Sequence, residues 1–213
     1  MHFLSDDLEN YIAQHSQAEP ELLAALNRET HLKIMQPRML SGHFQGRVLS
    51  MLSKIIRPNQ ILEIGTYTGY AALCLAEGLH PNGQLHTIEL NDELSVIQQK
   101  YFNLSPYKNQ IKPYYGNARE IIPSLDIMFD LVFIDADKES YATYFDLILP
   151  KMNKGGIILS DNVLWSGKVV EPVKANDKST QAIMAYNQKI NEDPRVETVL
   201  LPIRDGLTVT RVL

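Results

Sequence analysis

The chain has 213 residues, of which 45% are hydrophobic and 21% are charged, and its formal net charge is −5. This composition is typical of a globular domain, and the acidic balance disfavours a nucleic-acid-binding protein, which usually carries a basic face. The single cysteine, Cys74, excludes an internal disulfide framework and a cysteine-rich zinc site.

Helices are predicted before residue 60. The first two cover residues 5–15 and 20–33. A third follows from side chains that recur at helical spacing and form one apolar face, namely Phe44, Val48, Met51, Leu52 and Ile55. Pro58 and Asn59 end this helix, because both residues favour turns.

From residue 60 onward, short apolar runs alternate with helical stretches. Strands are expected over 60–65, 84–90, 111–116, 130–135 and 156–161, and helices over 70–79, 91–104 and 141–149. A last helix containing Ile183 and Ile190 precedes strands over 196–202 and 207–213, which a turn at 204–206 joins. Pro113 fits an edge strand. The pattern predicts an α/β fold with a mostly parallel seven-stranded sheet, a C-terminal antiparallel hairpin and helices on both faces.

A glycine-bracketed turn follows the first predicted strand. Gly65 and Gly69 allow a ligand to approach the backbone closely, but their spacing is not the GxGxxG of dinucleotide-binding sheets, and Glu63 would repel a pyrophosphate. Glu89 ends the second strand, where such sheets place an acid for ribose hydroxyls. Together these residues favour S-adenosylmethionine, which carries an ammonium, a sulfonium and a ribose. The alternative is a glycine turn that serves packing alone.

Three polar side chains end two predicted neighbouring strands. Asp135 follows one strand, and Asp161 and Asn162 end the next. Two carboxylates and an amide that converge on one point need positive charge between them, and oxygen ligands select a hard cation, which is Mg²⁺ or alternatively Ca²⁺ or Mn²⁺. The alternative is that each residue only caps a helix or turn.

Lys138 lies three residues after Asp135. Beside a divalent cation its ammonium form is disfavoured, since like charges repel, and a lysine so placed can take a proton from a hydroxyl. Asp137 could orient this lysine, touch the substrate or serve a turn. Trp165, shortly after Asn162, could form a wall for a flat substrate or pack within a loop.

Other catalytic arrangements lack support. The chain has no G-x-S-x-G motif, and Cys74 lies inside an apolar helical run, so a nucleophilic hydrolase is disfavoured. The six histidines show no paired ligand spacing and are expected on the surface or in loops, at positions 2, 15, 31, 43, 80 and 86.

Four stretches of the sequence together resemble one family: LEIGTYTGYAAL, IEL, FIDADKESY and ILSDNVLWSGKV. They are similar to the cation-dependent O-methyltransferases, the group of catechol and caffeoyl-CoA O-methyltransferases and their small bacterial relatives. MLSGHFQGRVLSML and DGLTVTR resemble flanking segments, so the similarity covers residues 35–213. The resemblance implies a Rossmann-like S-adenosylmethionine-dependent methyltransferase fold in one domain over residues 1–213. Residues 1–40 form its N-terminal helical segment, and residues 41–213 form its core.

The resemblance also implies roles for individual residues. A divalent metal is implied at Asp135, Asp161 and Asn162, and Lys138 matches the general base. The residues implied around S-adenosylmethionine are Ser41, Glu63, Gly65, Thr66, Gly69, Ala71, Glu89, Ala118 and Asp135. Two positions depart from the family pattern: Ala71 replaces a frequent serine, and Asp137 replaces the tryptophan of the animal catechol enzymes, which favours the caffeoyl-CoA branch.

The sequence therefore predicts an S-adenosylmethionine- and metal-dependent O-methyltransferase that methylates one hydroxyl of a vicinal dihydroxy-aromatic substrate. The alternatives are an NAD(P)-dependent oxidoreductase on the same sheet and a non-catalytic relative that binds S-adenosylmethionine. No apolar run approaches a membrane span and the acidic start lacks signal-peptide features, so we expect a cytoplasmic protein without membrane contact. The resemblance further implies a homodimer.

Overall fold

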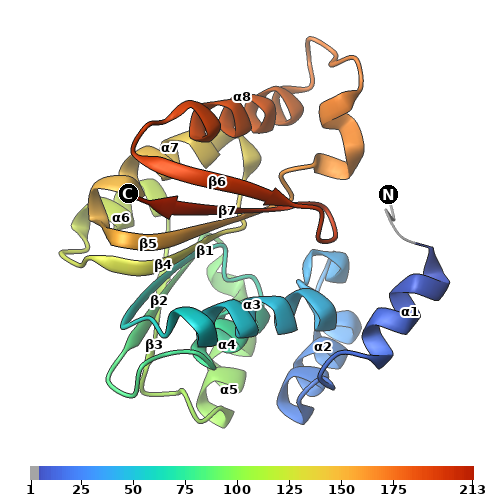
Figure 1. The fold of residues 1–213 in the computed structure, drawn as a ribbon. Coiled ribbons are helices and arrows are strands. Elements are labelled where there is room, and N and C mark those ends of the chain that lie inside the picture. The colour runs from blue at the N-terminus through green and yellow to red at the C-terminus, as the bar shows by residue number, and fades with distance from the viewer. Residues whose placement is uncertain (1–4) are drawn as a thin grey trace.

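The computed structural model describes residues 5–213, and its centre is a mixed sheet in the order β3-β2-β1-β4-β5-β7-β6 (Figure 1). The strands are β1 (Gln60–Ile64), β2 (Gln84–Glu89), β3 (Ile111–Tyr115), β4 (Phe129–Ile134), β5 (Met152–Asp161), β6 (Val196–Leu201) and β7 (Leu207–Val212). All pairs are parallel except β5–β7 and β6–β7. The predicted mostly parallel sheet with a C-terminal hairpin is confirmed, and β3 is an edge strand, as Pro113 indicated.

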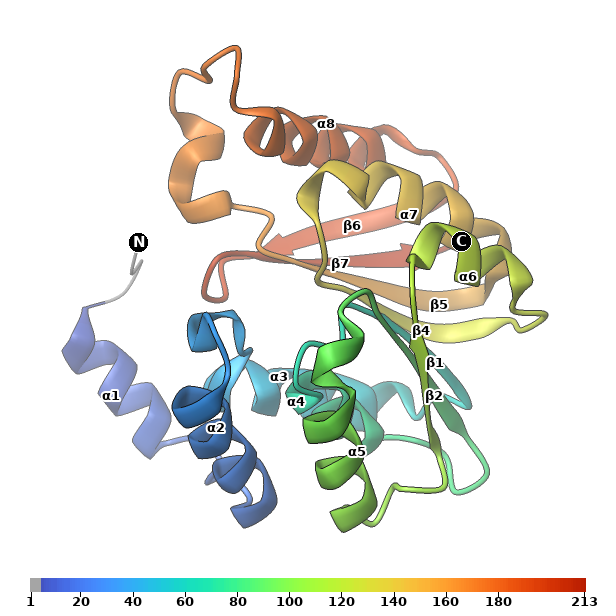
Figure 2. The ribbon, with the colours of Figure 1, turned by 180° about the vertical axis from the view of Figure 1, so that it is seen from behind.

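Helices cover both faces of this sheet (Figures 1 and 2). The α-helices are α1 (Asp6–Gln14), α2 (Glu21–Lys33), α3 (Gly42–Ile56), α4 (Tyr70–Ala76), α5 (Ser95–Leu104), α6 (Ala118–Ser124), α7 (Tyr141–Ile148) and α8 (Lys178–Glu192). Short 3₁₀ helices cover Pro37–Met39, Asp92–Leu94, Lys138–Ser140, Leu149–Lys151 and Trp165–Val170. No helix among residues 5–213 is long and apolar enough to cross a membrane.

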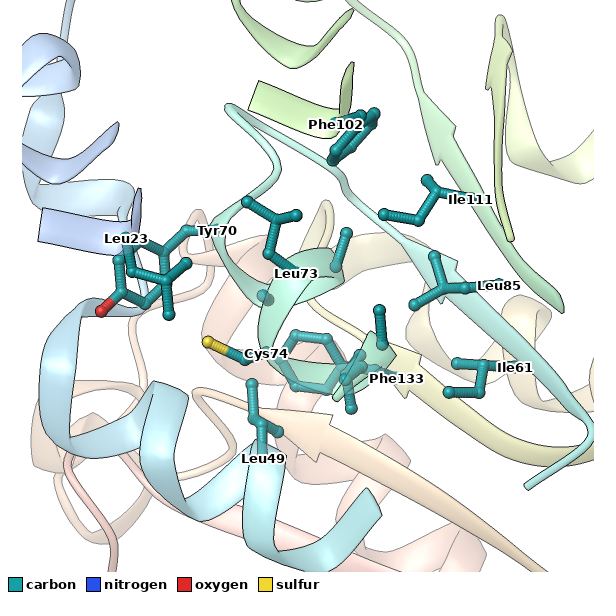
Figure 3. Packing of buried hydrophobic residues seen from close by; sticks show 14 of the residues in the cluster. Leu23, Leu49, Ile61, Tyr70, Leu73, Cys74, Leu85, Phe102, Ile111 and Phe133 are labelled. Carbon is teal, nitrogen blue, oxygen red and sulfur yellow. The ribbon is translucent and has the colours of Figure 1, made fainter. Parts of the chain in front are cut away.

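The core lies in two clusters, one on each face of the sheet. Side chains of α2, α3, α4 and α5 pack on the first face, where Leu23, Leu49 and Leu73 belong to the same cluster as Phe133 of β4 (Figure 3). Side chains of α6, α7 and α8 pack on the second face, where Phe145 and Ile183 are fully buried. The continuous apolar runs of the central strands are therefore buried on both sides, as parallel sheets require.

The apolar face predicted for α3 is not the face that packs most deeply. Met51 and Ile55 are 58% and 71% exposed, whereas the buried residues are Gln45, Gly46, Leu49, Ser50 and Ser53. Small residues face α4 because the two helices pack closely: a Cβ added to Gly46 would lie 2.7 Å from the ring of Tyr70. Close packing thus overrides the hydrophobic pattern and leaves an apolar stripe on the outside of α3.

Several local expectations differ from the structure. Helix α6 was not predicted, because it is short and contains Pro123; Asn117 caps it by accepting from the Arg119 N–H at 3.0 Å. Strand β5 starts at Met152 rather than at residue 156, since Met152 pairs with Phe129 before a register shift.

The expectation of surface or loop histidines is wrong for His86. This residue lies within β2 and is 3% exposed, with its ring nitrogens 3.0 Å from the Tyr114 hydroxyl and 3.1 Å from Gln60 Oε1. Two polar partners on neighbouring strands explain how a histidine is buried there. His2 lies outside the described residues.

Candidate active site

The carboxyl ends of β1, β4 and β5 meet in the middle of the sheet, because these strands are parallel neighbours. Gly65, directly after β1, has φ +97°, and a Cβ built on it would lie 1.9 Å from the carbonyl oxygen of Asp135. Only glycine fits this position, since it tolerates positive φ and has no side chain. The glycine turn therefore lies directly against the backbone of Asp135.

Lys138 forms hydrogen bonds to the polar side chains at the carboxyl ends of these strands. Its Nζ donates to Asn162 Oδ1 at 2.9 Å, to Asp135 Oδ1 at 3.2 Å and to the Tyr141 hydroxyl at 2.5 Å. The lysine is 8% exposed, so these bonds replace the water that a surface lysine would have. The Tyr141 hydroxyl donates in turn to the carbonyl of Asp161 at 3.0 Å. The structure thus brings together Asp135, Lys138 and Asn162 as the sequence predicted.

Asp161, 3% exposed, is held at both carboxylate oxygens. Gln45 Nε2 donates to Oδ2 at 2.6 Å, and the backbone N–H of Asn162 donates to Oδ1 at 2.8 Å. Burial, and then the negative charge of Asp135, raise the pKa of Asp161. The carboxylate therefore favours a positive partner on the side that faces Asp135.

Sequence reasoning missed Gln45 and Arg204, which join this centre from distant parts of the chain. Arg204, in the β6–β7 turn, donates to Gln45 Oε1 at 2.7 Å and to the carbonyl of Ser41. A glutamine on an amphipathic helix and an arginine in a turn carry no local signal of a shared site, and only the packing of α3 against the hairpin turn reveals it.

A pocket beside these residues is lined by several of the residues that were predicted to bind the cofactor. Its lining includes Ser41, Gly65, Thr66, Ala71 and Asp135. Tyr67 and Tyr70 line the same pocket. These residues come from the segment before α3, the turn after β1, the start of α4 and the end of β4, so the fold assembles the pocket from four separate segments.

Two acidic residues predicted near the cofactor differ in their surroundings. Glu63 is fully buried; burial, offset in part by a hydrogen bond from Thr87, raises its pKa to about 8, and its Oε1 has no hydrogen-bond partner. Glu89 accepts backbone N–H groups of Tyr67 at 2.7 Å and Asn91 at 2.9 Å, while burial raises its pKa. Both carboxylates are fixed by the protein and keep further acceptor capacity.

The other predicted residues are placed less centrally. Gly69 has φ +92°, and a Cβ added to it would lie 2.6 Å from the ring of Phe102; Ala118 begins α6 outside the pocket lining. Asp137 is exposed and accepts the hydroxyl of Tyr144 at 2.6 Å. The ring of Trp165 lies 5.9 Å from Lys138 Nζ, and its buried indole N–H has no hydrogen-bond partner.

The donor set at the strand ends consists of oxygen atoms. In the part of the chain that the structure describes, no group of three or more His, Cys, Asp or Glu side chains could hold a metal. Asp135, Asp161 and Asn162 form a different set, of two carboxylates and one amide, and two of them already converge on the Lys138 ammonium. Such a set fits a hard divalent cation rather than zinc.

The fold and this site define a Rossmann-like methyltransferase. The structure superposes on the S-adenosylhomocysteine-bound methyltransferase PaMTH1 of Podospora anserina with a TM-score of 0.89 at 28% identity, over 98% of this chain and 94% of the other. It superposes on an O-methyltransferase from Bacillus cereus in complex with S-adenosylhomocysteine with a TM-score of 0.88 at 26% identity, over 97% of both chains.

Residues 13–213 match the sequence model of the O-methyltransferase family, so the chain belongs to this family. It is 33% identical to a caffeoyl-CoA O-methyltransferase of Petroselinum crispum, over 97% of this chain and 91% of that protein. It is 31% identical to caffeoyl-CoA O-methyltransferase 1 of Arabidopsis thaliana, over 97% and 85%. The predicted family and fold are confirmed, and the alternative of an NAD(P)-dependent oxidoreductase has no support.

Proposed function

We propose that this protein, an S-adenosylmethionine-dependent O-methyltransferase, methylates one hydroxyl of a vicinal dihydroxy-aromatic substrate with the help of a divalent cation. The observation that carries the proposal is the convergence of Asp135, Lys138 and Asn162 on one point beside the pocket that Asp135 also lines. The caffeoyl-CoA O-methyltransferases among its relatives support a catechol-like or caffeoyl-like acceptor.

The methyl donor is proposed to occupy the pocket lined by Ser41, Gly65, Thr66 and Ala71. Glu63 supplies a buried carboxyl group next to this pocket, which it reaches through Thr87 and Thr66. Glu89, oriented by two backbone N–H groups, is placed to accept ribose hydroxyls. Roles for Gly69 and Ala118 in donor binding remain predictions from the resemblance.

A divalent cation, with Mg²⁺ as the first choice, is proposed to be held by Asp135, Asp161 and Asn162. When bound, it supplies a Lewis acid that lowers the pKa of the two adjacent hydroxyls of the acceptor. Tyr141 and Asn162 hold Lys138 Nζ at the centre, and Asp135 is its longest contact, at 3.2 Å. We expect Nζ to release one proton to solvent when the cation binds and to exchange this longest contact for the acceptor hydroxyl, whose proton the resulting amine receives.

In the transfer step, the acceptor oxygen forms a bond to the methyl carbon while the carbon–sulfur bond breaks and its electron pair returns to sulfur. The proton stays on Lys138 Nζ. Opposite charges on phenolate and sulfonium disappear together, so a site shielded from water favours the reaction. The protein contributes by holding both reactants in line. The exposed Asp137 and the ring of Trp165 are proposed to contact the acceptor.

The test is a methyl-transfer assay with catechol-type acceptors and their monohydroxy counterparts. We expect turnover on the diols, loss of turnover with a chelator and recovery with Mg²⁺. Equal rates on mono- and dihydroxy acceptors, or full activity in chelator, contradict the metal-assisted proposal. Binding of S-adenosylmethionine without transfer to any acceptor would instead favour a non-catalytic relative.

We also propose that the chain forms a homodimer. The support is the family resemblance together with the exposed apolar stripe on α3, where Met51 and Ile55 are 58% and 71% exposed. An apolar stripe of this kind gains stability when a partner covers it.

A further inference from the structure

We propose that Arg204 and Gln45 act as positioning residues that fix the carboxylate of Asp161 for cation binding, and that the β6–β7 turn is therefore part of the cation site. The inference rests on the proposed function, because it concerns a residue that the proposal assigns to the cation. It assigns roles to two side chains that neither line the cofactor pocket nor serve as cation ligands.

The orientation of the Gln45 amide follows from hydrogen-bond chemistry. A guanidinium only donates, so the oxygen of Gln45 must face Arg204 and its nitrogen must face Asp161. The distances agree: Arg204 Nη1 lies 2.7 Å from Gln45 Oε1, and Gln45 Nε2 lies 2.6 Å from Asp161 Oδ2. Arg204 thereby determines which end of the amide meets the carboxylate.

Because these hydrogen bonds are buried, the loss of one of them is not compensated by solvent. Gln45 and Asp161 are 2% and 3% exposed, so water does not replace a lost partner. The second carboxylate oxygen of Asp161 accepts from the N–H of Asn162 at 2.8 Å. One donor at each oxygen sets the plane of the carboxylate and leaves its remaining lone pairs for a cation.

The position of Arg204 is itself fixed by the fold. It has φ +49°, a conformation that residues other than glycine seldom adopt, and its Nη1 also donates to the carbonyls of Leu40 and Ser41. On the other side of the turn, the carbonyls of Asp205 and Gly206 accept from Leu164 at 2.9 Å and Val163 at 3.3 Å. The turn is thus held between the segment before α3 and the segment after Asp161.

The predicted consequence is a loss of cation affinity in variants that break the chain. Removing a hydrogen-bond partner of a ligating carboxylate typically weakens metal affinity about 10- to 100-fold. We expect this loss for Gln45→Met, which keeps the size but not the donor, and for Gln45→Glu, which keeps a partner for Arg204 but not the donor to Asp161. Arg204→Met should lose affinity in the same direction, and Arg204→Lys should restore most of it.

The experiment titrates metal-free protein with Mn²⁺ and follows the free ion by electron paramagnetic resonance, which needs no turnover. Ser53→Ala on α3 is the matched control, since Ser53 is fully buried and donates to the carbonyl of Leu75 at 2.6 Å, away from the centre. The control should bind Mn²⁺ as the wild type does. Thermal unfolding of each metal-free variant checks that it folds.

The outcomes separate the two proposals. Wild-type protein that binds no Mn²⁺ overturns the proposed cation site and this inference with it. Wild-type binding with an unchanged dissociation constant in both folded Gln45 variants overturns the inference alone, as does an equal loss in Ser53→Ala. Loss in the Gln45 variants and in Arg204→Met, with recovery in Arg204→Lys, supports it.

Discussion

Lys138 combines a buried position with bonds to three partners from different parts of the site. Lys138→Met removes the proposed proton acceptor but leaves the donor pocket intact. General-base catalysis typically contributes about 10²- to 10⁴-fold, so kcat should fall by at least about 100-fold, whereas the affinity for S-adenosylmethionine measured by calorimetry should stay unchanged. A decrease in kcat below about tenfold would remove Lys138 as the base.

The raised pKa of Glu63 makes the stability of the protein depend on pH. Its pKa in the folded protein is raised to about 8 from the model-peptide value of 4.5, so its contribution to stability is present below pH 4.5 and is lost as the pH rises through 8. Relative to wild type, Glu63→Gln should gain roughly 3–5 kcal/mol of unfolding free energy between pH 4.5 and pH 9. Urea unfolding at both pH values measures this gain.

The same Glu63→Gln variant should bind S-adenosylmethionine more weakly, by about tenfold for a loss of 1.4 kcal/mol. The exposed Glu93→Gln serves as the control and should change neither quantity. A stability difference that does not vary with pH would show that Glu63 is ionised in the folded state.

At the scale of elements, Glu77 joins α3 to the end of α4. Burial would raise its pKa, but hydrogen bonds from Arg47, Lys54 and Ser50 outweigh burial and lower the pKa to about 2. Its contribution is therefore present above pH 4.5 and is lost as the pH falls toward 2.

Glu77→Gln leaves the Arg47 guanidinium without its carboxylate and should lower the unfolding free energy by about 2 kcal/mol at pH 7. The difference from wild type should shrink at pH 3, as measured by urea unfolding at both pH values. Glu197→Gln, which breaks the exposed pair with Arg211, should change stability by less than about 0.5 kcal/mol. A Glu77 effect as small as this control would contradict the prediction.

At the same scale, the strands could be predicted from the sequence, whereas the packing of α3 could not. Strands such as β4 and β5 were predictable because their apolar runs are continuous and end in carboxylates. The packing of α3 was not, because hydrophobic periodicity ranks Met51 above Gly46, whereas close contact with α4 selects the smaller residue. Gln45 was missed for the same reason, since its partners Asp161 and Arg204 are more than a hundred residues away in sequence.

For the molecule as a whole, the exposed apolar stripe on α3 is the surface at which we predict that two chains form the homodimer. Wild-type protein should sediment as a dimer, and the double variant Met51→Glu/Ile55→Glu should sediment as a monomer with unchanged circular dichroism. Val96→Glu is the control, because Val96 is also an exposed apolar residue, at 77%, but lies on α5. A monomeric wild type, or dissociation caused by the control, contradicts the assignment of this stripe.

The strand order has a consequence for how the family can diversify. Most proposed donor-binding residues precede β4, from Ser41 to Ala118, whereas the proposed cation ligands, the base and the acceptor contacts all follow it. The two groups adjoin where β1 and β4 lie side by side, at Gly65 and Asp135. Changes in acceptor choice can therefore accumulate in the second half of the gene while the methyl donor is retained, as long as Asp161 and Arg204 keep their bonds to Gln45 in the first half.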